Sequence, residues 1–439
     1  MRFAPHTDDD IRAMLDVIGL ASLDDLFAQV PADVRLDRPL DLPAGVSELE
    51  IVEDVAALAR SNRSLEDLVC FAGAGAYDHY VPSAVWALAG RAEFTTSYTP
   101  YQPELSQGTL QALFEFQSMI CELTAMEVSN ASLYDGATAL VEAVNMARER
   151  ARGRVLVCGG VDPRFVETLR TYGRGSGYEP ETQAARQGRS SVPTVGDDVA
   201  AVIVQHPNVY GLLEDVAPIA EAAHAAGARL IQIFDPTSLG ILTPPGELGA
   251  DVAVAEGQPL GNRLAYGGPY LGLIAARMAD VRRMPGRIVG ETVDVDGATG
   301  YVLTLQAREQ HIRREKATSN ICTNQTLMAL AATVHLAWLG PGGLVELGRQ
   351  CHSRAVYALA VLTAIDGVEP LFPGAAFFKE FAIRLPRPAA EVRDAMLARG
   401  FLAGVPAPGE PDALLVAVTE RRTRAQIDAF AAALGEELS

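Results

Sequence analysis

Two short stretches of this 439-residue chain carry residues that could bind a small charged ligand. Asp235 follows the apolar run Ala228–Phe234, which predicts a buried strand, and a carboxylate in that position can pair with a cationic group. The stretch Asp135–Thr138 (DGAT) opens a predicted helix, whose unpaired N–H groups and partial positive charge suit a phosphate. By itself the second pattern favours simple helix capping.

The order of the residues after Asp235 matches a known type of cofactor site. In aminotransferase-like enzymes that use pyridoxal phosphate, an aspartate at the end of one strand pairs with the cofactor's ring nitrogen. A lysine just past the next strand forms the Schiff base. Asp235 suits the first role, but Gln258 stands at the second position, after the apolar run Asp251–Ala255. The chain's only lysines, Lys316 and Lys379, lie far downstream, so the sequence predicts this fold without its covalent anchor.

The surrounding elements predict a parallel sheet that is buried on both faces. Continuously apolar strands alternate with helices, which is typical of such sheets. Their ligands bind beyond the carboxyl ends of the strands, where Asp235 falls. No GxGxxG motif follows any of these strands, which argues against a dinucleotide site. The expected strands are Arg154–Cys158, Val199–Gln205, Ala228–Phe234 and Leu271–Ala276, and the expected helices include Gly108–Thr124, Pro163–Tyr172 and Val216–Ala226.

We expect three parts along the chain. Residues 1–70 form an N-terminal helical arm, since Thr7 and the acidic residues after it can cap a helix with an apolar face. Residues 71–325 form a large α/β domain of the pyridoxal-phosphate transferase type. Residues 326–439 form a long connecting helix and a small α+β domain, with strands expected at Glu369–Phe372, Phe377–Leu385 and Ala413–Val418.

Composition excludes several classes of function. A formal net charge of -19 argues against binding to nucleic acid or to an anionic membrane surface. Five scattered cysteines without a CxxC pair suit reduced thiols, and the seven histidines form no metal-binding motif, so no metal site is expected. No apolar run approaches the roughly 20 residues that span a bilayer, and the N-terminus lacks the apolar centre of a signal peptide. We therefore expect a cytoplasmic protein.

Two further segments have two interpretations each. Residues 71–108 combine prolines and glycines with aromatic residues, among them Tyr98 and Tyr101; they suit either a loop whose aromatics fill a core or a loop at an active site or interface. Residues 308–316 crowd His311, Arg314 and Lys316 with two other arginines inside an acidic protein. They suit either a solvated helix face with local acidic partners or a site for an anionic group.

Long motifs along the chain resemble one family. The chain is similar to the P-protein of the glycine cleavage system, glycine dehydrogenase (decarboxylating), in its split form. Within that form it resembles the subunit that corresponds to the N-terminal half of the fused enzyme. The motifs occur in the family's order and span most of the chain: FTTSYTPYQPELSQGTLQALFEFQ (94–117), SLYDGATA (132–139), AYGGPYLG (265–272), MPGRIVGE (284–291) and REQHIRREKATSNICTNQ (308–325).

The resemblance implies an aminotransferase-like fold and a role in a complex. The family's P-protein decarboxylates glycine with pyridoxal phosphate and passes the aminomethyl group to the lipoyl arm of H-protein. In the split form subunit 2 carries the lysine, and the two chains assemble as a heterotetramer with two copies of each. The resemblance thus implies pyridoxal phosphate bound covalently by subunit 2, and Gln258 is the residue type that its partner should have.

The resemblance also assigns expectations to individual residues. Five positions match cofactor-binding residues of the fold and are expected to remain only as vestiges: Asp135, Gly136, Ala137, Thr138 and Asp235, of which Asp235 could instead cap the next segment. Five others are candidates for the interface with subunit 2: Tyr98, Tyr101, His311, Arg314 and Lys316. The alternatives are a scaffold that only holds subunit 2 and H-protein, and a self-contained enzyme anchored on Lys316.

Overall fold

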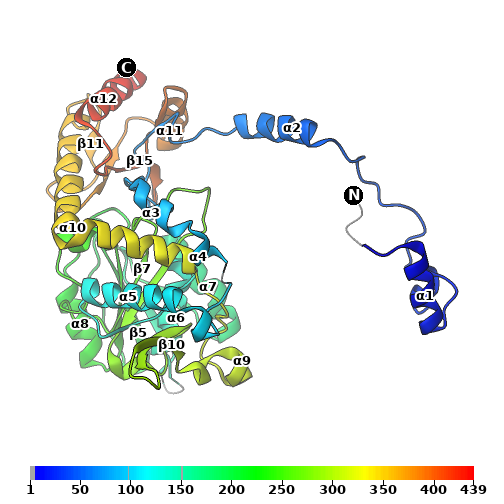
Figure 1. Ribbon diagram of the computed structural model, residues 1–439. Helices are drawn as coiled ribbons and strands as arrows, with labels where there is room; N and C mark the ends of the chain where they lie inside the picture. Colours follow the sequence, from blue (N-terminus) through cyan, green and yellow to red (C-terminus); the bar gives the residue numbers. More distant parts are fainter. Residues whose placement is uncertain (1–4, 97, 150–151) are drawn as a thin grey trace. The chain divides into compact units, whose positions relative to one another are not determined.

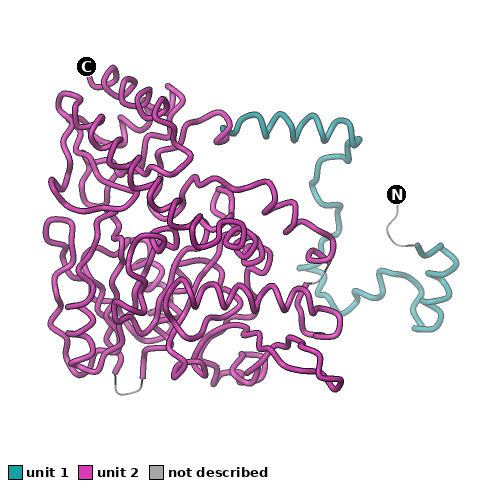
Figure 2. Tube along the Cα trace, turned by 60° about the vertical axis from the view of Figure 1, so that its left-hand side comes forward, with its two compact units in different colours: residues 1–63 teal, residues 64–439 magenta. Residues whose placement is uncertain are grey.

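The computed structural model describes residues 5–96, 98–149 and 152–439, and the chain forms two compact units that meet between Arg63 and Ser64 (Figure 2). The first unit contains helices α1 (Asp8–Ile18) and α2 (Glu48–Arg60) and the 3₁₀ turn η1 (Leu23–Phe27). A capping box precedes each of the three, because a serine or threonine and the acidic residue three positions later satisfy each other's backbone N–H groups. The hydroxyl and acidic residues of the predicted arm therefore mark the first residues of its helices.

A seven-stranded sheet forms the centre of the second unit, in the order β2-β8-β7-β6-β5-β3-β4 (Figure 1). The five strands from β3 to β7 are parallel, whereas β8 runs antiparallel to both β7 and β2. The sheet is thus mainly parallel, as the sequence predicts. The strands are β2 (Val128–Ser129), β3 (Arg154–Val157), β4 (Pro180–Thr182), β5 (Val199–His206), β6 (Arg229–Phe234), β7 (Val252–Glu256) and β8 (Gly272–Ala276).

Helices cover both faces of this sheet. Val202 and Val204 of β5 pack with α5 (Gln107–Thr124) and α8 (Val216–Ala225), whereas Ile203 packs with α6 (Gly136–Ala147) and α7 (Pro163–Ser176) on the opposite face. Successive side chains of a strand point to opposite faces, so continuously apolar strands supply both cores. The result is a three-layer α/β/α domain.

Helix α10 (Thr326–Leu362) connects this domain to the small one. It bends at Gly340, whose backbone angles (φ 61°, ψ 177°) are not helical and which precedes Pro341. Figure 1 shows one part of α10 beside α5 and the other beside α12 (Arg424–Leu438). By length and composition α10 is the one helix among the described residues that could span a membrane. Its buried leucines Leu330, Leu347 and Leu362 belong to the cores of the folded unit, which accounts for that composition.

The small domain packs a four-stranded sheet, β11-β12-β15-β14, against helices α11 and α12. The predicted strand Phe377–Leu385 is too long by several residues, because β12 begins at Glu380. Phe377 instead forms a bridge with Leu212 of the large domain, and Phe378 N donates to Gly211 O. The elements are β11 (Glu369–Pro370), β12 (Glu380–Arg384), α11 (Ala389–Ala398), β14 (Val405–Ala407), β15 (Glu410–Ala417) and α12 (Arg424–Leu438).

The segment 277–325 contains a hairpin that the sequence analysis does not predict. Strands β9 (Ile288–Val293) and β10 (Thr299–Thr304) pair antiparallel, and short turns follow them, including α9 (Gln310–Arg313) and η6 (Arg314–Lys316). The remaining short elements are β1 (Val69–Cys70) paired with β13 (Phe401–Leu402), α3 (Ser83–Ala89), α4 (Ala92–Thr95) and the 3₁₀ turns η2 (Pro103–Leu105), η3 (Pro236–Gly240), η4 (Met278–Asp280) and η5 (Gln306–Arg308).

Candidate functional site

Asp235 stands directly after β6 and uses its two carboxylate oxygens for different partners. Its Oδ1 atom accepts from Thr237 N at 2.9 Å and from Thr237 Oγ1 at 2.7 Å, so the residue caps the turn η3. Its Oδ2 atom lies 2.7 Å from Nζ of Lys379. Burial acts to raise the pKa of Asp235, but the Lys379 ammonium and these hydrogen bonds outweigh it and hold the pKa below its usual value. Asp235 is therefore an ionised carboxylate that already has a cationic partner.

Lys379 is 1% exposed and lies immediately before β12 of the small domain. Besides Asp235 it donates to Thr237 Oγ1 at 2.9 Å and lies 3.0 Å from His79 Nε2. Its ammonium also lies 3.8 Å from the ring centroid of Tyr77. A buried ammonium needs such partners, because desolvation otherwise favours its neutral form. Sequence analysis missed this role, although Lys379 is one of two lysines in the chain.

His79 continues this network to Glu420. Its Nδ1 atom lies 2.7 Å from Oε2 of Glu420, whose Oε1 atom accepts from Tyr80 N at 2.5 Å. Burial of Glu420 is outweighed by His79 and by these hydrogen bonds, and the pKa of the carboxyl falls to about 2. His79, Cys351 and Glu420 are the one group of potential metal ligands that the described residues bring together. Both nitrogens of His79 already have partners, one of them a cation, so the group does not suit a metal ion.

Gln258, at the position of the expected lysine, is 1% exposed and points at backbone groups. Its Oε1 atom accepts from Tyr77 N at 2.8 Å, and its Nε2 atom donates to Asn262 O at 2.7 Å and to Tyr77 O at 3.1 Å. A side-chain amide can satisfy a backbone N–H and a carbonyl at once, which an ammonium cannot. Gln258 therefore fixes the segment around Tyr77 in place.

The start of α6, where the fold would hold a phosphate, is occupied by carboxylates. Asp135 caps the helix and accepts from Thr138 N at 2.8 Å. Gly136 N donates to Oε2 of Glu256 at 3.0 Å, and Oε1 of Glu256 accepts from Gln258 N at 2.9 Å and from Leu271 N at 3.0 Å. Burial raises the pKa of Glu256 to about 7 despite these donors. A phosphate would meet the Glu256 carboxyl group here, and backbone donors that are already paired with it.

The cavity between these two places is small. It has a volume of about 60 Å³, and its lining includes Asp235, Lys379 and Glu256. Sites for drug-sized ligands have roughly 300–1,000 Å³. The described residues therefore do not fit pyridoxal phosphate: the ring-nitrogen partner is taken by Lys379, the phosphate position by Glu256 and the lysine position by Gln258.

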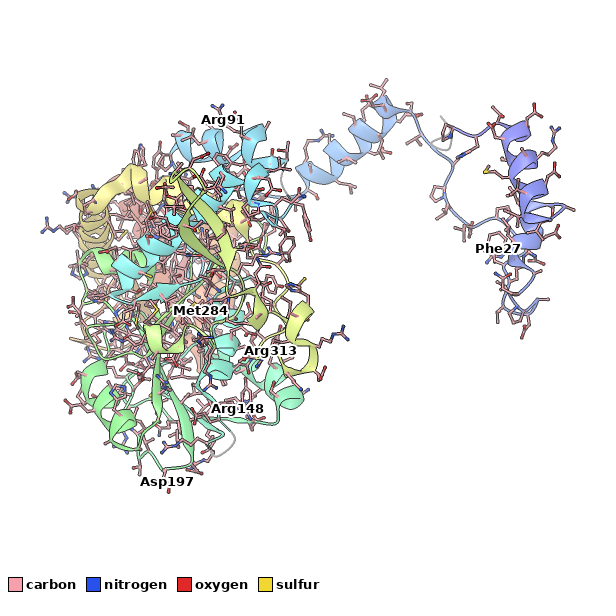
Figure 3. All side chains as sticks on the ribbon, turned by 60° about the horizontal axis from the view of Figure 1, so that its bottom comes forward. Phe27, Arg91, Arg148, Asp197, Met284 and Arg313 are labelled. Atoms are coloured by element: carbon pink, nitrogen blue, oxygen red, sulfur yellow. The ribbon has the colours of Figure 1, made fainter. Side chains whose placement is uncertain are left out.

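The interface candidates lie elsewhere, on the surface formed by residues 94–109 and 308–325. Tyr98 is 90% exposed and, with Tyr101, lines a groove of about 720 Å³. The ring centroids of Tyr101 and His311 lie 6.4 Å apart, so the structure brings these two predicted residues together. Arg314 and Lys316 are exposed in the turn η6, and neither side chain forms a hydrogen bond or ion pair with another described residue. The neighbouring Arg313, labelled in Figure 3, is exposed as well.

Arg287 supports this surface from beneath and was not singled out by the sequence analysis. It is 4% exposed, its guanidinium lies 5.2 Å from the ring centroid of Tyr101, and it donates to Asn324 Oδ1 and Cys322 O, both at 2.9 Å. Among the described residues its hydrogen-bond partners include no carboxylate, which is unusual for a buried charge. The family motif MPGRIVGE contains Arg287 and could have pointed to it from the sequence.

Comparisons with known proteins agree on one family. The family model of the glycine cleavage system P-protein matches residues 1–434. Subunit 1 proteins of glycine dehydrogenase (decarboxylating) from Carboxydothermus hydrogenoformans and Moorella thermoacetica are 49% and 51% identical, and each match covers 99% of both chains. A crystal structure of glycine decarboxylase (P-protein) of the glycine cleavage system, in inhibitor-bound form, has 48% identity and a TM-score of 0.92 over 99% of this chain and 100% of that one.

A more distant structure extends the fold comparison. The sphingosine-1-phosphate lyase of Burkholderia pseudomallei matches with a TM-score of 0.66 at 17% identity, over 94% of each chain, which concerns the fold alone. The architecture is that of the pyridoxal-phosphate enzymes of fold type I, as expected from the positions of Asp235 and Gln258. On the family match and the high identity over nearly the whole length, the chain belongs to the glycine cleavage system P-protein family.

Proposed function

We propose that this chain is the lysine-lacking subunit of a two-chain glycine dehydrogenase (decarboxylating). Subunit 2 carries pyridoxal phosphate on its lysine, and the complex decarboxylates glycine and passes the aminomethyl group to the lipoyl arm of H-protein. The observation that carries the proposal is Gln258, which stands at the Schiff-base position with its amide committed to Tyr77 and Asn262. The names of the relatives, which are subunit 1 proteins, support it.

In this proposal the surface of residues 94–109 and 308–325 faces subunit 2. Tyr98, Tyr101, His311, Arg314 and Lys316 then shape the shared pocket or the entry of the lipoyl arm. Two features support this place: exposed aromatic and cationic side chains gather there, and the buried Arg287 lacks a carboxylate partner among the described residues. We further propose a cytoplasmic heterotetramer with two copies of each chain.

Reconstitution tests the proposed function. Three preparations are made: this chain alone, a lysine-bearing homologue encoded beside it alone, and the two chains produced together. Each preparation is supplied with pyridoxal phosphate and lipoylated H-protein, and the exchange of the glycine carboxyl group with labelled bicarbonate is measured. We expect exchange only from the co-produced pair. Full exchange by the homologue alone, or by this chain alone, contradicts the proposal.

The scaffold alternative is separated by substitutions on the proposed shared surface. Arg314→Ala and Lys316→Ala should lower the exchange rate of the assembled pair while the pair still elutes as one species, because both side chains are exposed and support no internal contact recorded among the described residues. Normal exchange in both variants and in Tyr101→Ala would favour a subunit that only holds the others in place.

A further inference from the structure

The small cavity is lined by an ammonium group, from Lys379, and by a carboxyl group, from Glu256, of the chain itself. We infer that Lys379 and Glu256 replace the two charged ends of the cofactor, so that the ammonium takes the place of the protonated ring nitrogen at Asp235 and the carboxylate takes the place of the phosphate at the start of α6. This inference rests on the fold type and does not depend on the proposed function.

The contacts of Lys379 account for its whole hydrogen-bonding capacity. An ammonium has three N–H donors. Its three neighbours are Asp235 Oδ2 at 2.7 Å, Thr237 Oγ1 at 2.9 Å and His79 Nε2 at 3.0 Å. His79 accepts at Nε2 in the tautomer that carries its proton on Nδ1, and the Glu420 carboxylate beside Nδ1 favours that tautomer. The aspartate at this strand end thus has its cation supplied from within the chain.

The contacts of Glu256 repeat the pattern of a bound anion. Three backbone N–H groups, from Gly136, Gln258 and Leu271, point at its two oxygens at 2.9 to 3.0 Å. Backbone donors at a helix start are what the fold offers to a phosphate. A Cβ atom on Gly136 would come within 2.7 Å of Glu256 N, so the helix start lies directly against the end of β7. Neither the donors nor the space are left for a phosphate.

The replacement of the cofactor's ring nitrogen by Lys379 has a structural consequence for the two domains. Lys379 belongs to the small domain, whereas Asp235 and Thr237 belong to the large one. Removing one member of a buried ion pair leaves the other charge without compensation, which costs much more than removing both. The contact between the domains therefore depends on Lys379, and added cofactor should not stabilise the chain.

Thermal unfolding of the full chain, purified without its partner, tests the first half of the inference. Lys379→Met should lower Tm by about 5 °C or more, because it leaves the buried Asp235 carboxylate without a cationic partner. The double variant Lys379→Met with Asp235→Asn should recover part of that loss. Lys316→Met is the matched control, since it removes the other lysine of the chain, which is exposed, and should leave Tm unchanged. Equal Tm values for the wild type and Lys379→Met would overturn the inference.

Addition of pyridoxal phosphate tests the second half. The wild-type chain should show no change in Tm with the cofactor, because both charged positions are filled. The double variant Lys379→Met with Glu256→Gln should show a rise in Tm that grows with cofactor concentration. Pyridoxine without a phosphate is the ligand control and should raise Tm less. A cofactor-dependent rise in the wild type equal to that of the double variant, or no rise in the double variant, would overturn the inference.

Discussion

The Nζ atom of Lys379 lies 2.7 Å from Oδ2 of Asp235, and this contact joins the small domain to the end of a central strand of the large one. The residues just before Lys379 bring it there, because Phe377 bridges to Leu212 instead of extending β12. In the fold type I enzymes the same strand end serves the cofactor's ring nitrogen. In this chain the Asp235 side of the site is therefore occupied by the chain's own ammonium group.

Gln258 should contribute to stability through its three hydrogen bonds to Tyr77 and Asn262. Gln258→Ala removes them and leaves buried backbone groups unpaired, and we expect a loss of about 2–3 kcal/mol in the free energy of unfolding, measured with urea. Gln111→Ala is the control, since the exposed Gln111 donates only to Glu115 on the same helix and should change the value by less than about 0.5 kcal/mol. Equal losses from the two variants would show that the hydrogen bonds of Gln258 stabilise the fold no more than that of an exposed glutamine.

Gly136 should tolerate no side chain, whereas Gly108 should. Gly136→Ala places a Cβ atom 2.7 Å from Glu256 N, and we expect a loss of about 1–3 kcal/mol from overpacking. Gly108 lies in the first turn of α5 with open space around it, so Gly108→Ala should be neutral or stabilise by up to about 1 kcal/mol. Urea unfolding of the two variants decides the matter, and a stable Gly136→Ala variant would speak against the close approach of α6 and β7.

Stability should fall as the pH rises from about 6.5 to about 8. Burial raises the pKa of Glu256 and of Glu380 to about 7, so in this range the folded chain holds protons that the unfolded chain has already lost. The buried His206 and His335 have pKa values lowered to about 4 and oppose the trend only below about pH 6.5, where their unfolded forms take up protons.

Urea unfolding at several pH values measures this slope. Glu256→Gln should make the slope shallower, because the glutamine carries no titrating proton while Glu380 still titrates. Glu122→Gln, at an exposed position, is the control and should leave the slope as in the wild type. A free energy of unfolding that rises through this pH range would contradict the assignment of raised pKa values to the two buried carboxyls.

Arg287 should act on the reaction by positioning Tyr101 and the segment around Asn324. In the assembled pair, Arg287→Lys should lower the glycine–bicarbonate exchange rate by about tenfold, because a lysine cannot donate to Asn324 and Cys322 while it lies against the Tyr101 ring. Arg282→Lys, at an exposed position nearby, should change the rate little. If Arg287→Lys alters only the Tm and not the exchange rate or the KM for glycine, the residue is structural.

The sequence predicts the architecture well because burial on both faces imposes continuous apolar strands such as Val199–His206, and these are readable without a structure. The hairpin β9–β10 was missed because glycine, glutamate and threonine interrupt the apolar residues of both strands, IVGETV and TGYVLT. Only Ile288, Val289 and Leu303 of the two strands are buried. Lys379 was missed for a different reason. Its partners Asp235 and His79 come from distant parts of the chain, and a tertiary ion pair leaves no local pattern.

The positions of Asp235 and Gln258 in the site could be predicted from the order of residues in the family. The side chains that fill the cofactor's positions, Lys379 and Glu256, could not. Glu256 reads as the polar end of an apolar strand, and only the fold reveals the three N–H groups that converge on it. The assignment of Tyr98, Tyr101, His311, Arg314 and Lys316 to the interface stays a prediction, since it concerns contacts with another chain.

The location of the covalent cofactor tests the central claim most directly. The assembled pair is loaded with pyridoxal phosphate, reduced with borohydride, digested, and the phosphopyridoxyl peptides are identified by mass spectrometry. The account predicts one modified lysine, on the partner chain, and unmodified Lys316 and Lys379 in this one. Stoichiometric modification of Lys316 or Lys379 would contradict it.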